Sequence, residues 1–449
     1  MRYLSSRAVK KNLHIAWPLA INALLMQSML MVDALLISPL GEASLAALGI
    51  ATTLIAFCFG TQMALANGSQ LLFSRAIGAK NKKQLEQHFT SALWINLASG
   101  VCFLLGMMVL GPWLVRQLSQ ESRVIEQALE YLALGQYLLL LNALTQVLLA
   151  LFNADGKTKI SLYGYLLEMP INAIASYFLI HGVLSWTGMG VSGAALGSLV
   201  AIVLRALYLV WRCQSANIIQ VTLTFPGWDV IYQHWLHIYS IAANVTLLSM
   251  GMSAYQLIYS QLPLTAYVAI SLLFPWVRIG NQVGTAWAQA SAICLSQRLG
   301  AGRWSWLALE TRLLLKGSMW IACLSVGFFV LLSALFPLLY PDLAAETQRH
   351  LMVLAPLYIL LPLARVYNTS QGHILRALGH AKWVFRVHFI GQWCVALPLC
   401  TLVVLYTDVP VFWAFAIFVC EDVLKIVPFI FLMRRAIRTA PAQGGLSSP

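Results

Sequence analysis

The stretch FNADGKTK, residues 152–159, returns in altered form as LRALGHAK at residues 375–382, which places Gly156 opposite Gly379 at an offset of 223. Other landmarks keep nearly the same spacing. SRAIGAK (74–80) matches SQRLGAG (296–302) at an offset of 222, and Pro39 and Pro112 match Pro263 and Pro337 at offsets of 224 and 225. Landmarks in one order at near-constant spacing indicate an internal repeat. The chain is therefore predicted to be one structural unit duplicated.

The composition predicts what kind of unit this is. Of the 449 residues, 60% are hydrophobic and 10% are charged, whereas soluble domains carry about 25% charged residues. Twelve apolar runs, each long enough to cross a bilayer, lie at residues 14–39, 45–70, 89–111, 128–152, 160–180, 191–211, 236–260, 266–290, 314–337, 351–373, 384–406 and 410–433. Because backbone groups in lipid must be satisfied within each segment, the sequence predicts an all-α polytopic membrane protein.

The repeat divides the twelve predicted spans into two sets of six. The expected organisation is an N-lobe at 1–211, a cytoplasmic linker at 212–235, a C-lobe at 236–433 and a cytoplasmic tail at 434–449. An even number of helices in each half gives both halves the same orientation in the membrane, so they should form two pseudo-symmetric lobes around a central cleft. Rocking of two such lobes would give alternating access.

Charge and cysteine content exclude several function classes. The formal net charge is +13, but the lysines and arginines gather in alternate loops, which is the positive-inside pattern of a multi-pass inner-membrane protein with both termini in the cytoplasm rather than a sign of nucleic-acid binding. The eight cysteines are scattered without a C-x-x-C pair, so no disulfide framework or metal site is expected. No ATP-binding or hydrolase motif occurs in a usable context, and no enzymatic activity is expected.

Acidic residues inside the predicted spans are the main functional signal. Asp33 lies in SMLMVDALLISPLG (28–41), where an acid near the middle of a span costs about 2.5 to 3.5 kcal/mol on insertion scales. Its counterpart in the second half is Leu257, so packing does not require an acid there. Glu168, Asn172 and Ser176 are spaced four apart and should share one helical face. Polarity is thus concentrated in the first half, whereas a channel would need a polar stripe in both.

Two doubled motifs resemble those of a known family. G-A-x-[NR] occurs at 78–81 and 300–303, and [NR]-A-x-G-x-x-K occurs at 153–159 and 376–382. The chain resembles the MATE (multidrug and toxic compound extrusion) transporters, and within them the DinF-like branch, over nearly its whole length. The resemblance implies export of organic cations or amphipathic small molecules, driven by inward movement of protons or sodium. The wider group also contains flippases for lipid-linked substrates, so fold alone leaves the substrate open.

The resemblance implies a coupling site in the N-lobe. The family's first-helix Asp, fifth-helix Asn and sixth-helix Thr fall on Asp33, Asn172 and Ser198, and Ser176 stands where the family has a second Asp. Sodium favours several hard oxygen ligands with compensating charge. The absence of the second Asp therefore favours protons as the coupling ion, unless Glu168 supplies the missing carboxylate. Alternatively, Glu168 could lie near the cytoplasmic end of its helix and extend its carboxylate to the membrane surface. In this hypothesis protonation of Asp33 shifts the first helix and releases the substrate. No cofactor is expected besides the coupling ion.

The second half and the substrate contacts are less specific. Glu421, Asp422 and Lys425 on the twelfth span, with Arg278 and Arg365, are expected to form a structural network rather than a second ion site. Flexible or aromatic side chains suited to flat cations are Met26, Gln27, Tyr137 and Tyr255. The expected function is proton-coupled drug export by a monomer. The alternatives are a sodium-coupled exporter, or a flippase, for which only Arg278 and Arg365 offer cations.

Overall fold

A computed structural model describes residues 2–183, 186–216, 218–219, 224–303, 306–341, 343–407 and 409–444. Parts of the expected linker (217 and 220–223) and of the expected tail (445–449) lie outside the described residues. The regular elements are α1 (Arg2–Ile37), α2 (Glu42–Gly78), α3 (Lys82–Leu118), α4 (Ser122–Gly135), α5 (Leu138–Ala154), α6 (Thr158–His181), β1 (Gly182–Val183), β2 (Trp186–Thr187), α7 (Val191–Ser215), α8 (Trp228–Tyr259), α9 (Leu264–Gly300), α10 (Leu307–Leu339), α11 (Ala345–Ala377), α12 (Ala381–His388), α13 (Leu397–Tyr406) and α14 (Val411–Gly444), together with the short segments η1 (Ser38–Leu40) and η2 (Phe389–Ala396).

These elements confirm the predicted helical membrane fold. By length and composition, eight helical segments of the described residues can cross a membrane, and the pair α4 and α5, bent by 48°, makes a ninth. Adding α6, α9 and α14 gives twelve helical segments in the described part of the chain, in the order of the twelve apolar runs. The antiparallel hairpin of β1 and β2, two residues per strand, is a small addition to the expected all-α fold.

Two of the spans are less regular than the sequence predicted. The fourth, expected at 128–152, is broken between α4 and α5, and Tyr137 lies in the break. In the eleventh, α12 and α13 are joined by η2, a π-helix over Phe389–Ala396. Hydrophobic periodicity does not predict either feature, because it records the spacing of apolar residues and not the pattern of backbone hydrogen bonds. π-helical turns occur often at functional sites.

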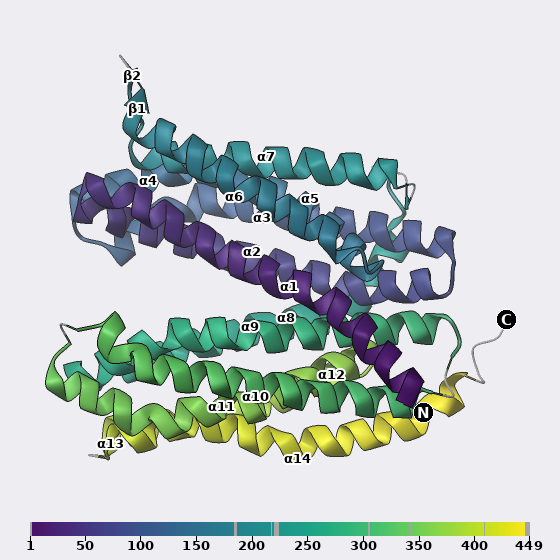
Figure 1. Cartoon of the computed structure of the whole chain (residues 1–449). Coiled ribbons are helices and arrows are strands. Elements are labelled where there is room, and N and C mark those ends of the chain that lie inside the picture. Colours follow the sequence, from purple (N-terminus) through teal and green to yellow (C-terminus); the bar gives the residue numbers. More distant parts are fainter. Residues whose placement is uncertain are drawn as a thin grey trace. The chain divides into compact units, whose positions relative to one another are not determined.

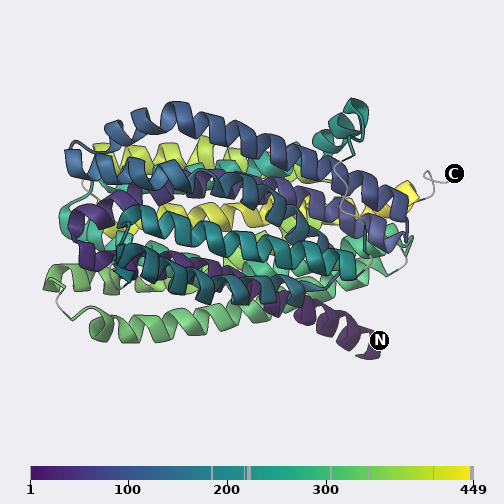
Figure 2. The same ribbon diagram turned by 90° about the horizontal axis from the view of Figure 1, so that it is seen from above.

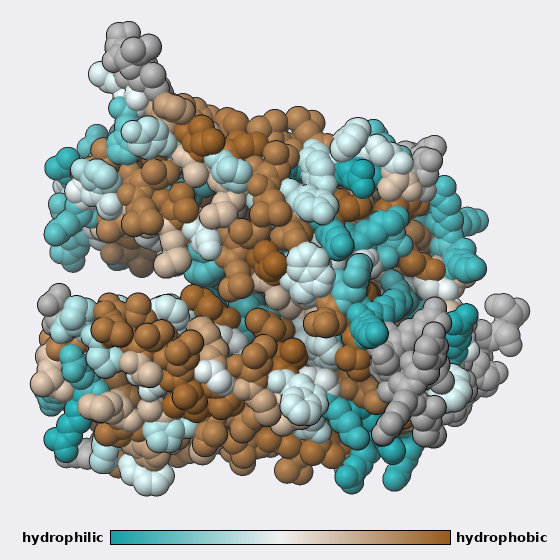
Figure 3. All heavy atoms as spheres, in the orientation of Figure 1, coloured by the Kyte–Doolittle hydropathy of each residue, from teal (hydrophilic) through white to brown (hydrophobic). Residues whose placement is uncertain are grey.

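The surface of each unit has the distribution that a bilayer requires. Apolar side chains cover the middle of the helices, and polar side chains gather near their ends (Figure 3). Large apolar residues such as Leu35, Val109, Leu207, Trp320 and Leu338 are more than half exposed. In a soluble protein exposed apolar surface on this scale would cause association, whereas in a membrane it faces lipid.

The chain divides into two compact units. The N-terminal unit comprises Ile21–Ala242, and the C-terminal unit comprises Met1–Ala20 with Ala243–Pro449. Within each unit the long helices run side by side with roughly aligned axes (Figures 1 and 2). The buried apolar cores of the N-terminal unit form around Phe73, Phe89 and Phe152 and around Ile55 and Tyr131. That of the C-terminal unit is rich in aromatic rings, including Tyr259, Phe329 and Phe415.

Two helices cross from one unit into the other. The boundary falls at Ala20 within α1 and at Ala242 within α8, and these positions are 222 residues apart, which is the repeat offset. The first half of α1 thus packs in the C-terminal unit, where the Asn12 amide donates to the Trp287 carbonyl and Lys11 donates to Gln297. The first half of α8 packs in the N-terminal unit, where Ile238 lies against Gly68.

Candidate functional site

A hydrogen-bonded cluster joins three helices inside the N-terminal unit. Asn172 on α6 donates its Nδ2 to Oδ1 of Asp33 on α1 at 2.9 Å. The Oδ1 of the same amide accepts from Ser198 on α7 at 3.0 Å and from Ser176 on α6 at 3.4 Å. Asp33, Asn172 and Ser176 are buried, and Ser198 is partly buried. The structure therefore brings together all four residues onto which the family's site was carried.

Local sequence explains how the cluster forms. Residues 172 and 176 lie one helical turn apart and face the same side of α6. At Gly197 on α7 a side chain would not fit, because a Cβ there would lie 2.7 Å from the backbone nitrogen of Ser176. This close approach of α7 to α6 brings the neighbouring Ser198 within reach of Asn172.

Asp33 differs from the other buried acids in its lack of a cation. In the described part of the chain the buried acids are Asp33, Glu168, Glu310, Glu421 and Asp422. The last four form ion pairs with Arg205, Arg298, Lys425 and Arg365, respectively. Asp33 forms no ion pair with any described residue, and its carboxylate accepts a hydrogen bond from the neutral amide of Asn172. An isolated buried carboxylate is unstable unless a cation or a proton accompanies it.

Glu168 has a partner that the sequence analysis missed. Its Oε2 lies 2.5 Å from Nη1 of Arg205 on α7, and Nη2 of Arg205 donates to Thr145 on α5 at 3.1 Å. The guanidinium also lies over the Tyr165 ring, 4.7 Å from its centroid. Glu168 is only 3% exposed, so it does not snorkel. The available signal was Arg205 itself, a charge in the apolar segment SLVAIVLRALYLV.

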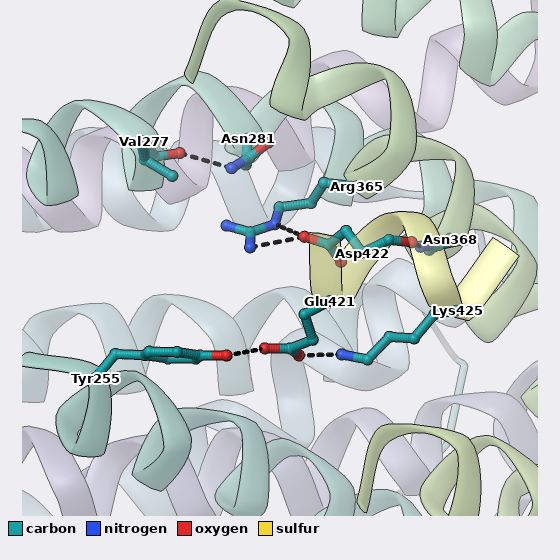
Figure 4. Close-up of polar contacts among 8 residues, drawn as sticks. All are labelled: Tyr255, Val277, Asn281, Arg365, Asn368, Glu421, Asp422 and Lys425. Carbon is teal, nitrogen blue, oxygen red and sulfur yellow. Dashed lines mark hydrogen bonds and ion pairs between the residues drawn. The ribbon is translucent and has the colours of Figure 1, made fainter. Parts of the chain in front are cut away.

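The predicted charges of the second half form two adjacent groups on α14 (Figure 4). Tyr255 donates its hydroxyl to Glu421 at 2.5 Å, and Glu421 pairs with Lys425. One residue along the chain, Asp422 accepts from Arg365 on α11 at 2.7 Å, and its backbone carbonyl accepts from Asn368. The Arg365 guanidinium also lies 4.4 Å from the Phe418 ring centroid. Arg278 is exposed and has no ion pair within the described residues.

The expected substrate contacts lie in different environments. Met26 and Tyr137 are exposed, at 40% and 44%, and Gln27 is partly exposed. Tyr255 is fully buried, and its hydroxyl is bound to Glu421. In this structure Tyr255 is therefore an internal member of the α14 network. Among the described residues, no group of three or more His, Cys, Asp or Glu side chains is arranged to hold a metal ion.

Comparison with known proteins finds similarity to multidrug resistance transporters. The MatE family model matches residues 18–178, which contain Asp33, Asn172 and Ser176. The chain is 29% identical over 213 residues to the probable multidrug resistance protein NorM of Rhodopseudomonas palustris, covering 47% of this chain and 43% of that one. It is 22% identical to the probable NorM of Rhizobium meliloti, with 91% and 90% covered, and 23% identical to the uncharacterized transporter YisQ of Bacillus subtilis, with 86% of each covered.

Solved structures agree at the level of the fold. An outward-facing multidrug resistance MATE family transporter of the MOP superfamily superimposes with a TM-score of 0.86 at 17% identity, covering 97% of both chains. A MATE protein in the bent conformation gives 0.87 at 16% identity, covering 98% of this chain and 99% of that one. The chain thus shares the fold of these two proteins over nearly its whole length.

Proposed function

We propose that this protein is a secondary active exporter that moves organic cations or amphipathic compounds out of the cell in exchange for protons, with Asp33 as the proton-accepting group. It would act as a monomer in the inner membrane, with both termini in the cytoplasm. The observation that carries this proposal is the isolation of Asp33, the one buried acid of the described residues without a cation beside it.

The chemistry of exchange follows from that isolation. A carboxylate with no internal counter-ion can be neutralised by a proton or accompanied by a cationic substrate. Because one negative charge serves both, binding of either weakens binding of the other, and the effect is reciprocal. Asn172 connects this choice to α6 and α7, since the amide that donates to Asp33 also accepts from Ser198. A change of protonation at Asp33 can thus alter the packing of α1 against both helices.

The donor set favours a proton over sodium. A sodium site needs several oxygen atoms pointing at one position. Here the Asn172 oxygen is engaged by two serine hydroxyls, and its nitrogen faces Asp33. Glu168, the expected candidate for a second carboxylate, is bound to Arg205. This leaves the Asp33 carboxylate as the only charged oxygen ligand in the cluster described here.

The flippase alternative has less support. An anionic lipid-linked substrate would favour free cations, and of the two expected candidates Arg365 is bound to Asp422. Met26 and Tyr137 are exposed side chains of the N-terminal unit with a flexible thioether and an aromatic ring, which suit binding of flat cations.

The test is efflux of a fluorescent organic cation from proteoliposomes under an imposed pH gradient or an imposed sodium gradient. Asp33→Asn keeps the shape and removes the titratable charge. Glu42→Gln is the matched control, because it makes the same kind of change at an exposed acid in the first turn of α2. We expect the pH gradient alone to drive efflux in the wild type and in the control, and not in Asp33→Asn. Efflux that requires sodium, or that survives in Asp33→Asn, would contradict the proposal.

A further inference from the structure

Two histidines meet where the start of α8 packs into the N-terminal unit, and a third lies one turn along α8. Nε2 of His234 on α8 lies 2.9 Å from the Ser69 hydroxyl on α2. Nδ1 of His234 lies 3.4 Å from Nδ1 of His88 on α3, and the ring centroids are 5.4 Å apart. His234 is 2% exposed. His237, one turn along α8, is the other titratable group whose charge acts on both rings.

The geometry limits how many protons this contact can hold. A hydrogen bond between two Nδ1 atoms needs one nitrogen with a proton and one without. The neutral pair satisfies this, and so does a pair with a single extra proton, provided that His234 donates to Ser69. A second extra proton puts hydrogens on both facing nitrogens and two positive charges in contact. Neither ring forms an ion pair with an acid in the described residues, so nothing there offsets the repulsion.

In the other half of the repeat, an acid stands at the position equivalent to His88. At the offset of 222, His234 corresponds to Asn12 on α1, and His88 corresponds to Glu310 on α10. Glu310 forms an ion pair with Arg298, and the Lys11 charge acts on it. The start of α1 therefore meets an acid, which attracts cations, whereas the start of α8 meets a second imidazole.

We propose that His88 and His234 form a second proton-binding site, separate from Asp33, whose full protonation releases the first half of α8 from α2 and α3. The docked state binds fewer protons than the released state, so acidification favours release. Histidine is the side chain whose ordinary titration range makes such a switch operate near physiological pH. Because α8 continues beyond Ala242 into the C-terminal unit, the switch acts on a helix that both units share.

The experiment measures hydrogen–deuterium exchange of residues 228–242 in the full chain in lipid nanodiscs, between about pH 7.5 and about pH 5.5, where histidine titrates. Rates are corrected for the pH dependence of the chemical exchange step. In the wild type we expect exchange to rise as pH falls, by up to about tenfold per pH unit for each additional proton bound on opening. Residues 8–20 of α1 provide the internal comparison and should show no such rise.

Two substitutions at one position give opposite expectations. His88→Gln removes the second titratable ring and should flatten the pH dependence. His88→Glu copies the acid found at the equivalent position of the other half, so protonation of His234 becomes attractive and acidification should slow exchange. In His237→Gln the exchange of residues 228–242 should still rise as pH falls, as in the wild type. If one of the His88 variants does not fold, the other still tests the proposal.

The outcome is distinguishable from that of the Asp33 proposal. Asp33→Asn should lose proton-driven efflux and keep the pH-dependent exchange of α8. Three results would overturn the second site: no pH dependence of α8 exchange in the wild type, an unchanged pH dependence in His88→Gln, or loss of the pH dependence in Asp33→Asn. None of these results would alter the efflux test.

Discussion

The amide of Asn172 and the carboxylate of Asp33 are joined by a 2.9 Å hydrogen bond that links α6 to α1. A bond between a neutral donor and a charged acceptor contributes about 1.5 to 3 kcal/mol. Asn172→Ala should therefore reduce pH-driven efflux strongly. Ser176→Ala and Ser198→Ala remove neutral bonds worth about 0.5 to 1.5 kcal/mol and should have smaller effects. Efflux rates under a fixed pH gradient check this order, and a serine variant as defective as Asn172→Ala would contradict it.

The ion pair of Glu168 and Arg205 should prove structural. Breaking a buried pair by removing one partner costs about 3 to 5 kcal/mol, whereas replacing both partners with apolar residues is often nearly neutral. We expect Glu168→Leu and Arg205→Met each to lower the thermal unfolding midpoint strongly, and the double variant to recover most of the loss. The double variant should also retain proton-driven efflux. Loss of coupling in a well-folded double variant would show that Glu168 takes part in transport.

Mutation of the two tyrosines expected to bind substrate should have different effects on the stability of the fold. Tyr255→Phe removes a bond to the Glu421 carboxylate and should lower stability by about 1.5 to 3 kcal/mol. Tyr137→Phe makes the same change at a ring that is 44% exposed, and surface substitutions usually fall within about 0.5 kcal/mol of zero. Thermal unfolding of both variants in one detergent compares them. Equal effects would mean that the hydroxyl of Tyr255 does not stabilise the network.

Glycines on α2 offer a matched pair for the docking of α8. At Gly68 an added Cβ would lie 2.9 Å from Cβ of Ile238, whereas Gly60 on the same helix has no heavy atom within 4 Å. Gly68→Ala should destabilise the fold by about 1 to 3 kcal/mol through overpacking. Gly60→Ala should stabilise it by about 0.5 to 1 kcal/mol because alanine favours the helix. If Gly68→Ala also stabilised the fold, α8 could move away from the added methyl group without cost, which would contradict the prediction.

The sequence predicted the helical duplicated fold because spanning length and apolar composition are local properties. It also predicted Asp33, Asn172, Ser176 and Ser198 as one cluster, but only through the family resemblance, since residues 33 and 172 are far apart in the chain and no local pattern links them. The roles of these residues in coupling stay predictions.

Other features depend on packing that no local pattern records. Arg205 was overlooked as the partner of Glu168, although a charge in an apolar run signals a buried pair. The contact between His88 and His234 joins residues 146 positions apart. It became recognisable only when the crossing of α8 into the N-terminal unit was known.

Each unit contains the beginning of a helix that continues into the other unit, and this arrangement affects how the protein is completed during synthesis. The N-terminal unit cannot be complete when the first six spans have emerged from the ribosome, because it needs α8 up to Ala242. The opposite holds for residues 2–20, which are made first yet belong to the unit finished last. A gene split within the linker would therefore yield two fragments, each carrying a piece of the other's unit, and neither should be stable until both are present in the same membrane.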